Sequence, residues 1–339
     1  MMIIRPIAQK DLEILGDFPF ESHLGMTSLP RNRDKFLEKI TLSEACFQNP
    51  IIEHPGNEEY FFVLEDLTTG LLGGICGIMA QSRQNFTFVY RIETLENKTR
   101  FVQAPNEVKV LKVEDNPGDS SEVCALYLQP SFRHSRLGRL LSLSRFLFIA
   151  AFPGRFNTKI VAEMRGYIDK KQHSPFWDSI GRHFCDISFV ELMAKLEKSH
   201  DFIPEILPKY PIYLSLLPKE AQEMIGKIHE QTKPAYEMLL QENFAFDQQI
   251  DIFEGGPILT AQTSTIRSIE HSAVVQVDVT SELLTEEAEF IIGNERLDYR
   301  ACICKMRRLS QKEVLINEEA AQALLVKKGD FVRYVSIHA

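Results

Sequence analysis

The sequence has little of what membrane, secreted and nucleic-acid-binding proteins need. It contains no uninterrupted apolar run of about 18 residues, so a membrane-spanning helix is not expected. The opening MMIIRPIAQKDLEIL lacks the basic start and apolar centre of a signal peptide. The formal net charge of -9 leaves no surplus of Lys and Arg for binding polyanions, although it permits a cationic substrate. We expect a cytoplasmic protein.

Patterns for metal binding and for a serine nucleophile are also scarce. The 6 cysteines are scattered and several lie in apolar strand-like runs, which is typical of reduced core thiols. Cys302 and Cys304 form a lone CxC pair, whereas zinc usually needs four suitably spaced ligands. The histidines form no HxxxH pair, and there is no GxSxG motif. The sequence therefore predicts no metal and does not favour a serine nucleophile.

The most informative stretch is SEVCALYLQPSFRHSRLGRLLSLSRFLF, residues 121–148. Its first part is a nearly all-apolar run ended by Pro130, as expected of a strand buried on both faces. From Ser131 onward apolar residues recur at spacings of three and four, which predicts an amphipathic helix that begins within the loop. Free amides at the start of that helix, with arginines around them, favour an anion such as a pyrophosphate. The arginines are Arg133, Arg136, Arg139 and Arg145.

The segments before this stretch read mostly as strands. A short strand and a helix opened by Asp11 come first, and YFFVLE and LLGGICGIM form an antiparallel hairpin. The next strand, residues 85–95, has Arg91 and Glu93 on one face because strand side chains alternate. Residues 98–119 look like a polar excursion with one short apolar segment. Arg91 and Glu93 are therefore candidates for contacting a charged substrate.

After the central helix, KIVAEM at residues 159–164 predicts a parallel strand, since a helix between two strands makes a crossover. Glu163 and Arg165 lie at its end. Open parallel sheets bind ligands at the carboxyl ends of their strands, which makes these two residues candidates for binding a polar substrate. A surface ion pair between them is an equally good interpretation.

Further helices are predicted over residues 174–184, returning to a strand, and over residues 220–228 and 234–241. His229 lies between the last two helices next to polar residues. An exposed or capping histidine is the simpler interpretation, although its near-neutral pKa suits proton transfer.

Gly255-Gly256-Pro257 is the clearest boundary signal. Beyond it short alternating strands and one short helix predict a small β-rich lobe. We therefore predict a first domain over residues 1–256, with a core over 1–190 and a helical and strand extension over 191–256. The lobe covers residues 257–339.

Taken together, these segments resemble the GNAT superfamily of acyl-CoA-dependent N-acyltransferases. IIRPIAQKDLEIL is similar to its opening strand and helix, and LYLQPSFRHSRLGRLL to its acyl-CoA motif. In that motif an R/Q-x-x-G-x-G/A loop binds the CoA pyrophosphate through backbone amides. The corresponding residues run from Arg133 to Gly138, with Arg136 in place of the first glycine. The resemblance implies an α+β fold with a mixed, mostly antiparallel sheet, here with the β-rich lobe added.

Within the superfamily, the whole chain is similar in order and spacing to the arginine N-succinyltransferase family. The blocks that carry the likeness are GMTSLP, SSEVCALYLQP, SRFLFIAAF, VAEMRG, SPFWDSIGRHF, IGKIHEQT and DIFEGGP. The resemblance implies succinyl-CoA as co-substrate, no further cofactor, and an oligomer, either of one chain or with a paralogous subunit. It also implies a succinyl-CoA contact at Leu126 and a proton donor at His229. The CoA-binding residues expected with Leu126 are Leu128, Arg133, Ser135, Arg136, Gly138 and Arg139.

The reaction implied is attack of the α-amino group of L-arginine on the succinyl thioester, giving N2-succinyl-L-arginine and CoA, the first step of arginine catabolism by this route. A backbone amide near Leu126 can stabilise the oxyanion if the strand is splayed from its neighbour. Glu163 and Glu93 are candidates for the substrate guanidinium, and Arg165 and Arg91 for the succinyl carboxylate. A transferase that prefers ornithine or another amine, and a non-catalytic sensor of acyl-CoA or arginine, remain as alternatives.

Overall fold

The computed structural model describes residues 1–15, 29–30, 32–82, 88–96, 107–115, 118–285 and 287–338. Residues 25–28 of the GMTSLP block lie outside this range. As far as the central helix, the elements are β1 (Met2–Pro6), α1 (Asp11–Leu15), α2 (Arg33–Gln48), β2 (Glu59–Asp66), β3 (Leu72–Met79), β4 (Phe88–Glu96), β5 (Glu107–Asp115), β6 (Ser120–Leu128) and α3 (Leu137–Ala151).

The middle of the chain alternates short helices with strands. Its elements are β7 (Lys159–Glu163), α4 (Pro175–Ser179), α5 (Phe189–Leu196), β8 (Ile212–Tyr213), α6 (Lys219–Met224), α7 (Lys233–Gln241), β9 (Ala245–Ile250), β10 (Pro257–Gln262) and α8 (Arg267–Glu270). The last part is β-rich. Its elements are β11 (Ala273–Thr280), β12 (Glu289–Asn294), β13 (Ala301–Lys305), β14 (Arg307–Arg308), β15 (Glu313–Asn317), α9 (Glu318–Ala323) and β16 (Phe331–Ser336).

Short 3-10 turns connect several of these elements. They are η1 (Pro130–Phe132), η2 (Pro153–Arg155), η3 (Gly181–His183), η4 (Ile203–Ile206), η5 (Leu214–Leu216), η6 (Glu230–Thr232) and η7 (Thr263–Thr265).

The strands form one continuous hydrogen-bonded sheet of 16 strands over the described residues. Two neighbouring pairs, β6 with β7 and β11 with β15, are parallel, and the other pairs are antiparallel. The predicted α+β fold with a mixed, mostly antiparallel sheet is therefore confirmed. The strand order is β14-β15-β11-β16-β12-β13-β1-β2-β3-β6-β7-β10-β9-β4-β5-β8.

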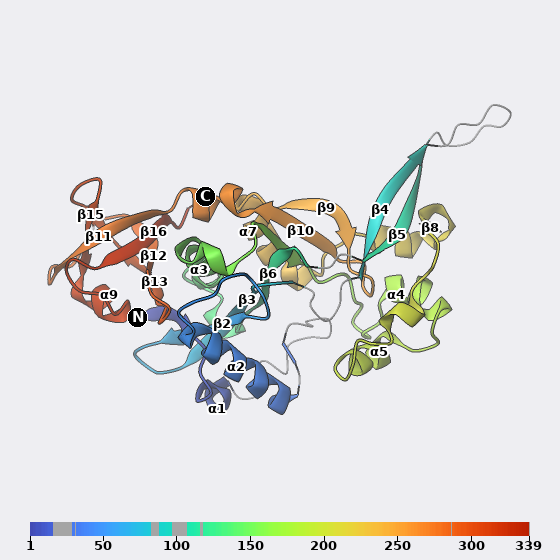
Figure 1. Ribbon diagram of the computed structural model, residues 1–339, viewed down its shortest axis with the longest axis horizontal. Coiled ribbons are helices and arrows are strands. Elements are labelled where there is room, and N and C mark those ends of the chain that lie inside the picture. The colour runs from blue at the N-terminus through green and yellow to red at the C-terminus, as the bar shows by residue number, and fades with distance from the viewer. Residues whose placement is uncertain are drawn as a thin grey trace.

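The sheet extends along the long axis of the molecule (Figure 1). Strands β11 to β16 lie at one end, and the β4–β5 hairpin lies with α4 and α5 at the other. The amino terminus lies at the first end, because β1 pairs with β13 on one side and with β2 on the other. The predicted β-rich part is thus joined edge to edge to the rest of the sheet.

Helix α3 packs on the centre of the sheet and is buried on almost every side. Gly74 of β3 allows the close approach, since a Cβ atom there would lie 2.9 Å from Leu141 Cδ2. The other side of α3 contacts α8, β12 and β13. The predicted amphipathic pattern therefore understates its burial, because two layers cover the helix. It also begins later than Ser131, since Ser135 and Arg136 adopt left-handed backbone angles that interrupt a helix.

An aromatic cluster around Phe148 of α3 holds these layers together. Its ring lies 5.2 Å from those of Phe62 on β2 and of Tyr299, which precedes β13. The Tyr299 hydroxyl donates a 3.0 Å hydrogen bond to the carbonyl of Ser144 on α3. Rings at these distances and tilts pack favourably, so one core includes residues from both predicted domains.

Three sequence-based expectations need correction. The excursion at residues 98–119 contains β5, which pairs with β4 along its whole length and buries the adjacent Val110 and Leu111, one on each face. The segment after residue 184 enters α5 through a Ser188–Glu191 capping box instead of returning to a strand. The helix expected over residues 220–228 ends at Met224, and Gly226 then takes a left-handed φ of 71°.

The predicted division at residue 257 falls directly before β10. That strand pairs with β7 and β9 near the middle of the sheet, so it lies with strands of the first predicted domain. The long-range pairing of residues 257–262 could not be read from the local glycine and proline signal. The division of the chain into two domains itself stays a prediction.

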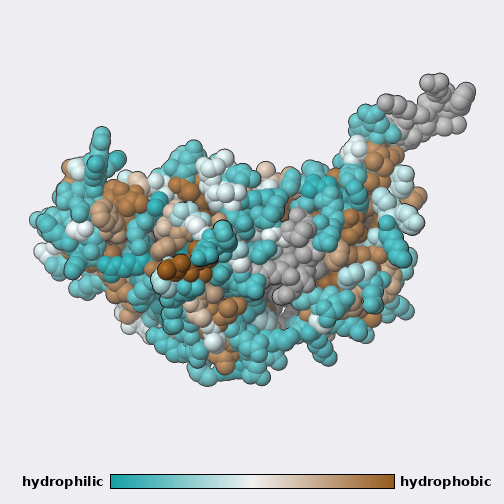
Figure 2. Space-filling view, in the orientation of Figure 1, coloured by the Kyte–Doolittle hydropathy of each residue, from teal (hydrophilic) through white to brown (hydrophobic). Residues whose placement is uncertain are grey.

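All 6 cysteines are free thiols, and 5 of them are buried, which agrees with the predicted reduced core thiols. In the described ranges no helix is long and apolar enough to cross a membrane. Figure 2 shows a largely hydrophilic face on which hydrophobic side chains lie in small separated patches.

The α7–β9 connection is tied to α8 by a buried ion pair. The carboxylate of Glu242 accepts bonds of 2.9 and 2.7 Å from the Arg267 guanidinium, and a third of 2.7 Å from the Ser268 amide. Both side chains are at most 10% exposed. Removing one partner would leave the other charge buried and uncompensated.

We therefore expect Glu242→Ala to lower the free energy of unfolding by about 3–5 kcal/mol, measured by urea denaturation. The control is Glu287→Ala, which removes the partly exposed pair with Arg307 and should cost less than about 1 kcal/mol. Equal losses in the two variants would contradict this role for the buried pair.

Candidate active site

The two parallel strands at the centre of the sheet diverge. Strands β6 and β7 pair from Ser120 to Glu122, and no pairing follows after Glu122. On its other side β6 stays paired to β3, but the register shifts opposite Cys76, where Ala125 has a left-handed φ of 53°. The divergence and this bulge together open the backbone around Leu126, as the sequence-based argument for a splayed strand required.

A buried arginine supports the bulge. The Arg145 guanidinium, only 2% exposed, donates to the carbonyl oxygen of Cys124 at 3.3 Å and to the carbonyl and hydroxyl of Ser142 at 3.1 and 3.0 Å. Burial lowers its pKa from the usual value. Local sequence does not distinguish Arg145 from the loop arginines, because its burial depends on a tertiary contact with β6.

Three segments converge at the end of β7. The amide of His229 donates a 2.9 Å hydrogen bond to the carbonyl of Arg165, and the amide of Gly226 donates a 2.8 Å bond to that of Gly255. Gly166 is required here, because a Cβ atom would lie 2.3 Å from the carbonyl oxygen of Glu254. The end of β7, the segment before η6 and the β9–β10 turn therefore form one rigid junction.

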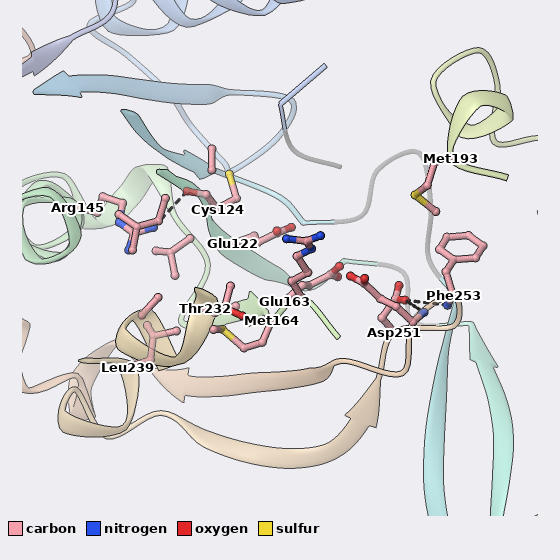
Figure 3. A pocket seen from close by; sticks show the side chains of 17 residues that line it. Glu122, Cys124, Arg145, Glu163, Met164, Met193, Thr232, Leu239, Asp251 and Phe253 are labelled. Carbon is pink, nitrogen blue, oxygen red and sulfur yellow. Dashed lines mark hydrogen bonds between the residues drawn. The ribbon is translucent and has the colours of Figure 1, made fainter. Parts of the chain in front are cut away.

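A pocket lies between the diverging strands and this junction (Figure 3). Of the residues predicted from the sequence, it brings together Leu126, Glu163 and Arg165. Cys124 and Arg145 lie at one end, Asp251 and Phe253 lie at the other, and Glu122 and Glu163 lie between them. Four carboxylic acids line it, namely Glu122, Glu163, Asp251 and Glu254. The pocket is therefore suited to a ligand that carries positive charge.

Glu254 is the most unusual acid of the pocket. It is 6% exposed, and its Oε2 has no hydrogen-bond partner among the described residues. Burial raises the pKa of Glu254 well above its usual range and the neighbouring Asp251 adds to the rise, while Arg165 and the Gly166 amide oppose it. The sequence-based reading missed this residue because it lies in the segment that was interpreted as a domain boundary.

His229 is half-buried beside the pocket and caps η6. Its Nδ1 accepts a 3.2 Å hydrogen bond from the amide of Gln231. When Nδ1 is the acceptor, the proton of a neutral imidazole is on Nε2, which can then act as a donor. This arrangement fits both the predicted proton donor and the simpler capping role.

The loop between β6 and α3 keeps the backbone shape of a glycine-rich loop without the glycine. Ser135 and Arg136 have φ values of 51° and 61°, both in the left-handed region that glycine adopts freely. The Arg136 guanidinium pairs with Glu289 of β12 at 2.7 Å. The departure from the motif thus changes the side chain and leaves the left-handed backbone in place.

The other arginine, serine and glycine residues predicted to bind CoA lie in this loop and in the first turn of α3. The Arg133 Nε donates to the carbonyl of Leu128 at 3.1 Å, and the Ser135 hydroxyl lies 3.0 Å from His134 Nδ1. Arg139 donates to the carbonyl of Ile337 at 2.8 Å, while a Cβ atom on Gly138 would meet Leu128 at 3.7 Å. CoA binding by these residues stays a prediction.

Arg91 and Glu93 do not join the other candidates. Arg91 pairs with Glu114 at 2.7 Å, Glu93 pairs with Lys112 at 3.2 Å, and neither lines the pocket. Both pairs link β4 to β5, so the structure gives these residues a cross-strand role. Their contact with substrate stays a prediction that this geometry does not favour.

We expect Arg136→Gly to raise the free energy of unfolding by up to about 1 kcal/mol. A left-handed backbone costs a non-glycine residue about 1–2 kcal/mol, whereas the exposed pair with Glu289 contributes about 0–1 kcal/mol. In the matched control Arg133→Gly, where φ is -77°, stability should fall, because the unfolded chain gains freedom worth about 0.4–1 kcal/mol and the hydrogen bond to Leu128 is lost. Similar losses in both variants, measured in urea, would argue against strain at Arg136.

A second expectation concerns pH. The pKa of Glu254 in the folded protein lies above its ordinary value of 4.5. At low pH Glu254 is protonated in both the folded and the unfolded protein, so it does not change the free energy of unfolding with pH. As the pH rises between the unfolded and the folded pKa, Glu254 ionises only in the unfolded protein. Ionisation then favours unfolding of the wild type, and glutamine cannot ionise. The stability of Glu254→Gln relative to wild type should therefore rise as the pH increases above the ordinary value of 4.5, measured in urea titrations. Exposed Glu237→Gln is the control, and a difference independent of pH would refute the shifted pKa.

Comparisons with known proteins match the whole chain. The family described as "Arginine N-succinyltransferase beta subunit" matches residues 2–268, and its C-terminal domain matches residues 272–336. A Pseudomonas aeruginosa relative, "Arginine N-succinyltransferase subunit alpha", is 36% identical over 99% of this chain and 100% of its own length. An Escherichia coli relative, "Arginine N-succinyltransferase", is 36% identical over 100% of this chain and 98% of its own length.

The fold agrees with these sequence matches. A solved structure, arginine/ornithine succinyltransferase subunit AI from Pseudomonas aeruginosa, aligns with a TM-score of 0.90 at 34% identity. The alignment covers 100% of this chain and 99% of that one. The chain belongs to the arginine N-succinyltransferase family.

Proposed function

We propose that the chain transfers the succinyl group of succinyl-CoA to the α-amino group of L-arginine, giving N2-succinyl-L-arginine and CoA. The observation that carries the proposal is the divergence of β6 from β7 at the Leu126 bulge, beside a pocket lined by carboxylates. Family membership supports this pair of substrates. In this role the protein begins arginine catabolism by the succinyl route.

Succinyl-CoA enters from the side of the β6–α3 loop. The left-handed backbone at Ser135 and Arg136 turns the chain into α3, and the start of that helix offers amides to the pyrophosphate. The pantetheine arm lies between the diverging strands. The thioester carbonyl then reaches the bulge, where the amide of Leu126 stabilises the oxyanion.

The transfer proceeds by direct attack of the neutral α-amine on the thioester carbon. A tetrahedral intermediate forms and collapses as its C–S bond breaks, and the proton that the attacking nitrogen loses is passed through His229 to the departing CoA thiolate. Cys124 is a poor alternative nucleophile, since burial raises the pKa of its thiol well above the usual value. A covalent acyl-enzyme is therefore not part of the proposal.

Charged groups of the pocket orient the two substrates. Glu163 faces the positive charge of arginine, and Arg165 pairs with the succinyl carboxylate. Arg91 and Glu93 are weaker candidates, because they pair within the β4–β5 hairpin.

Ornithine is a second candidate substrate. The solved relative is described as an arginine/ornithine succinyltransferase, and ornithine also carries a side-chain cation that carboxylates can bind. A non-catalytic sensor is less favoured, because Arg136, which stands in place of the motif glycine, has a left-handed backbone angle that glycine also adopts. The relative named as an alpha subunit supports assembly into an oligomer, which we place in the cytoplasm.

Thiol release from succinyl-CoA, followed with a thiol reagent, tests the proposal. We expect release that depends on L-arginine, weaker release with L-ornithine, and little with acetyl-CoA. His229→Ala should lower kcat by about two to four powers of ten, as is typical of losing a general acid or base. The control is His271→Ala, which changes an exposed histidine at the end of α8. The proposal fails if no donor releases thiol with either amine, and near-normal turnover of folded His229→Ala would reject the proton donor.

A further inference from the structure

The β9–β10 turn, residues 251–256, is built to hold two carboxyl groups at the pocket. Asp251 Oδ1 accepts hydrogen bonds of 2.7 Å from the amides of both Phe253 and Glu254. The amide of Asp251 donates a 2.8 Å bond to the carbonyl of Gly256. These bonds and the close contact with Gly166 fix the turn, so the positions of both acids are set before any ligand arrives.

Glu254 has a buried oxygen that the protein leaves unsatisfied. Its side chain lines the pocket, and Oε2 has no hydrogen-bond partner among the described residues. Buried polar atoms in proteins are nearly always paired, so an orphaned carboxyl oxygen in a pocket indicates a donor supplied by a ligand.

The charged residues around Glu254 indicate that the ligand group is positively charged. Asp251 and Glu163 lower the potential at Glu254, and Arg165 only partly compensates for them. Glu122 adds a fourth acid to the lining. A cation is therefore the group that this end of the pocket lacks.

The place of the acids along the pocket indicates which cation. Asp251 lies at the end opposite Cys124 (Figure 3), whereas the acyl group is transferred next to Cys124, at Leu126. The attacking α-amine must be neutral and must lie at the bulge. The charged group bound at the far end is then the one at the tip of the substrate side chain. A planar guanidinium, with five N–H donors, can bridge two carboxylates.

We propose that Glu254 and Asp251 form the subsite that binds the guanidinium of the substrate and so select amino acids with a cationic side chain. The inference rests on the proposed succinyl transfer and adds two specificity residues to it. Burial and Asp251 favour the protonated form of Glu254 in the empty pocket, whereas a bound cation favours its carboxylate. Binding therefore releases a proton from Glu254 to solvent, which couples substrate affinity to pH.

The kinetic test compares L-arginine with L-citrulline, which has nearly the same shape but an uncharged side chain. We expect wild type to prefer arginine strongly in kcat/KM, and Glu254→Gln to reduce the arginine-to-citrulline ratio by about 10-fold or more. The KM for succinyl-CoA should stay unchanged. Glu237→Gln, at an exposed position of α7, is the matched control and should keep the wild-type ratio. An unchanged ratio in an active Glu254→Gln enzyme would overturn the proposal.

Calorimetry separates this subsite from the transfer reaction itself. The ligand is 5-guanidinopentanoate, which is arginine without its α-amine and so cannot be acylated. Titrations near pH 7 in buffers of different ionisation enthalpy count the protons released. We expect wild type to bind with net proton release, and Glu254→Gln to bind at least about 10-fold more weakly without it.

The outcomes distinguish the proposed succinyl transfer from the proposed cation subsite. Proton-releasing binding in a protein that releases no thiol would uphold the cation subsite and reject the transfer. Thiol release by an enzyme that binds the analogue without releasing protons would uphold the transfer and reject the subsite. If Glu254→Gln does not fold, the proton count of the wild type alone decides.

Discussion

The separation of β6 from β7 after Glu122 is the constraint on which the rest of the structure depends. Two parallel strands that part inside a sheet leave backbone groups without their ladder partners, which is costly unless other groups replace them. Here the bulge at Ala125 changes the strand pairing, and the buried Arg145 guanidinium donates a hydrogen bond to the carbonyl of Cys124. These two features therefore stabilise the separation of β6 from β7 within the core.

The same region buries ionisable groups that folded chains usually keep at the surface. Arg145 lies within the core, and Glu254 lies in the pocket with an unsatisfied oxygen. Burying such groups has a desolvation cost that apolar residues of similar volume would avoid. Their retention fits a site in which stability is exchanged for recognition, as is common where ligands complete the hydrogen bonding.

The elements at the centre of the sheet could be predicted from the sequence better than those at its edges. The apolar run of β6, the periodicity of α3 and the parallel placement of β7 are local signals, and they led to Leu126, Glu163 and Arg165 in one pocket. Arg145 and Glu254 were missed because their environments are made by distant segments. Arg145 is buried against Cys124 of β6, and the carbonyl of Glu254 packs against Gly166 after the end of β7. Local patterns also failed at β5, whose partner strand is what makes it a strand.

The position of β1 between β2 and β13 bears on how the chain acquires its structure. Ile3 pairs with Glu65 on one side and with Cys302 on the other, so β1 receives its second neighbour only after the intervening chain as far as β13 has been made. Until then one edge of the sheet stays open, and open edges invite pairing with other chains. Such a long sequence separation between partners also slows folding. A truncated product that lacks β13 would therefore leave β1 paired with β2 alone, with its other edge open to association.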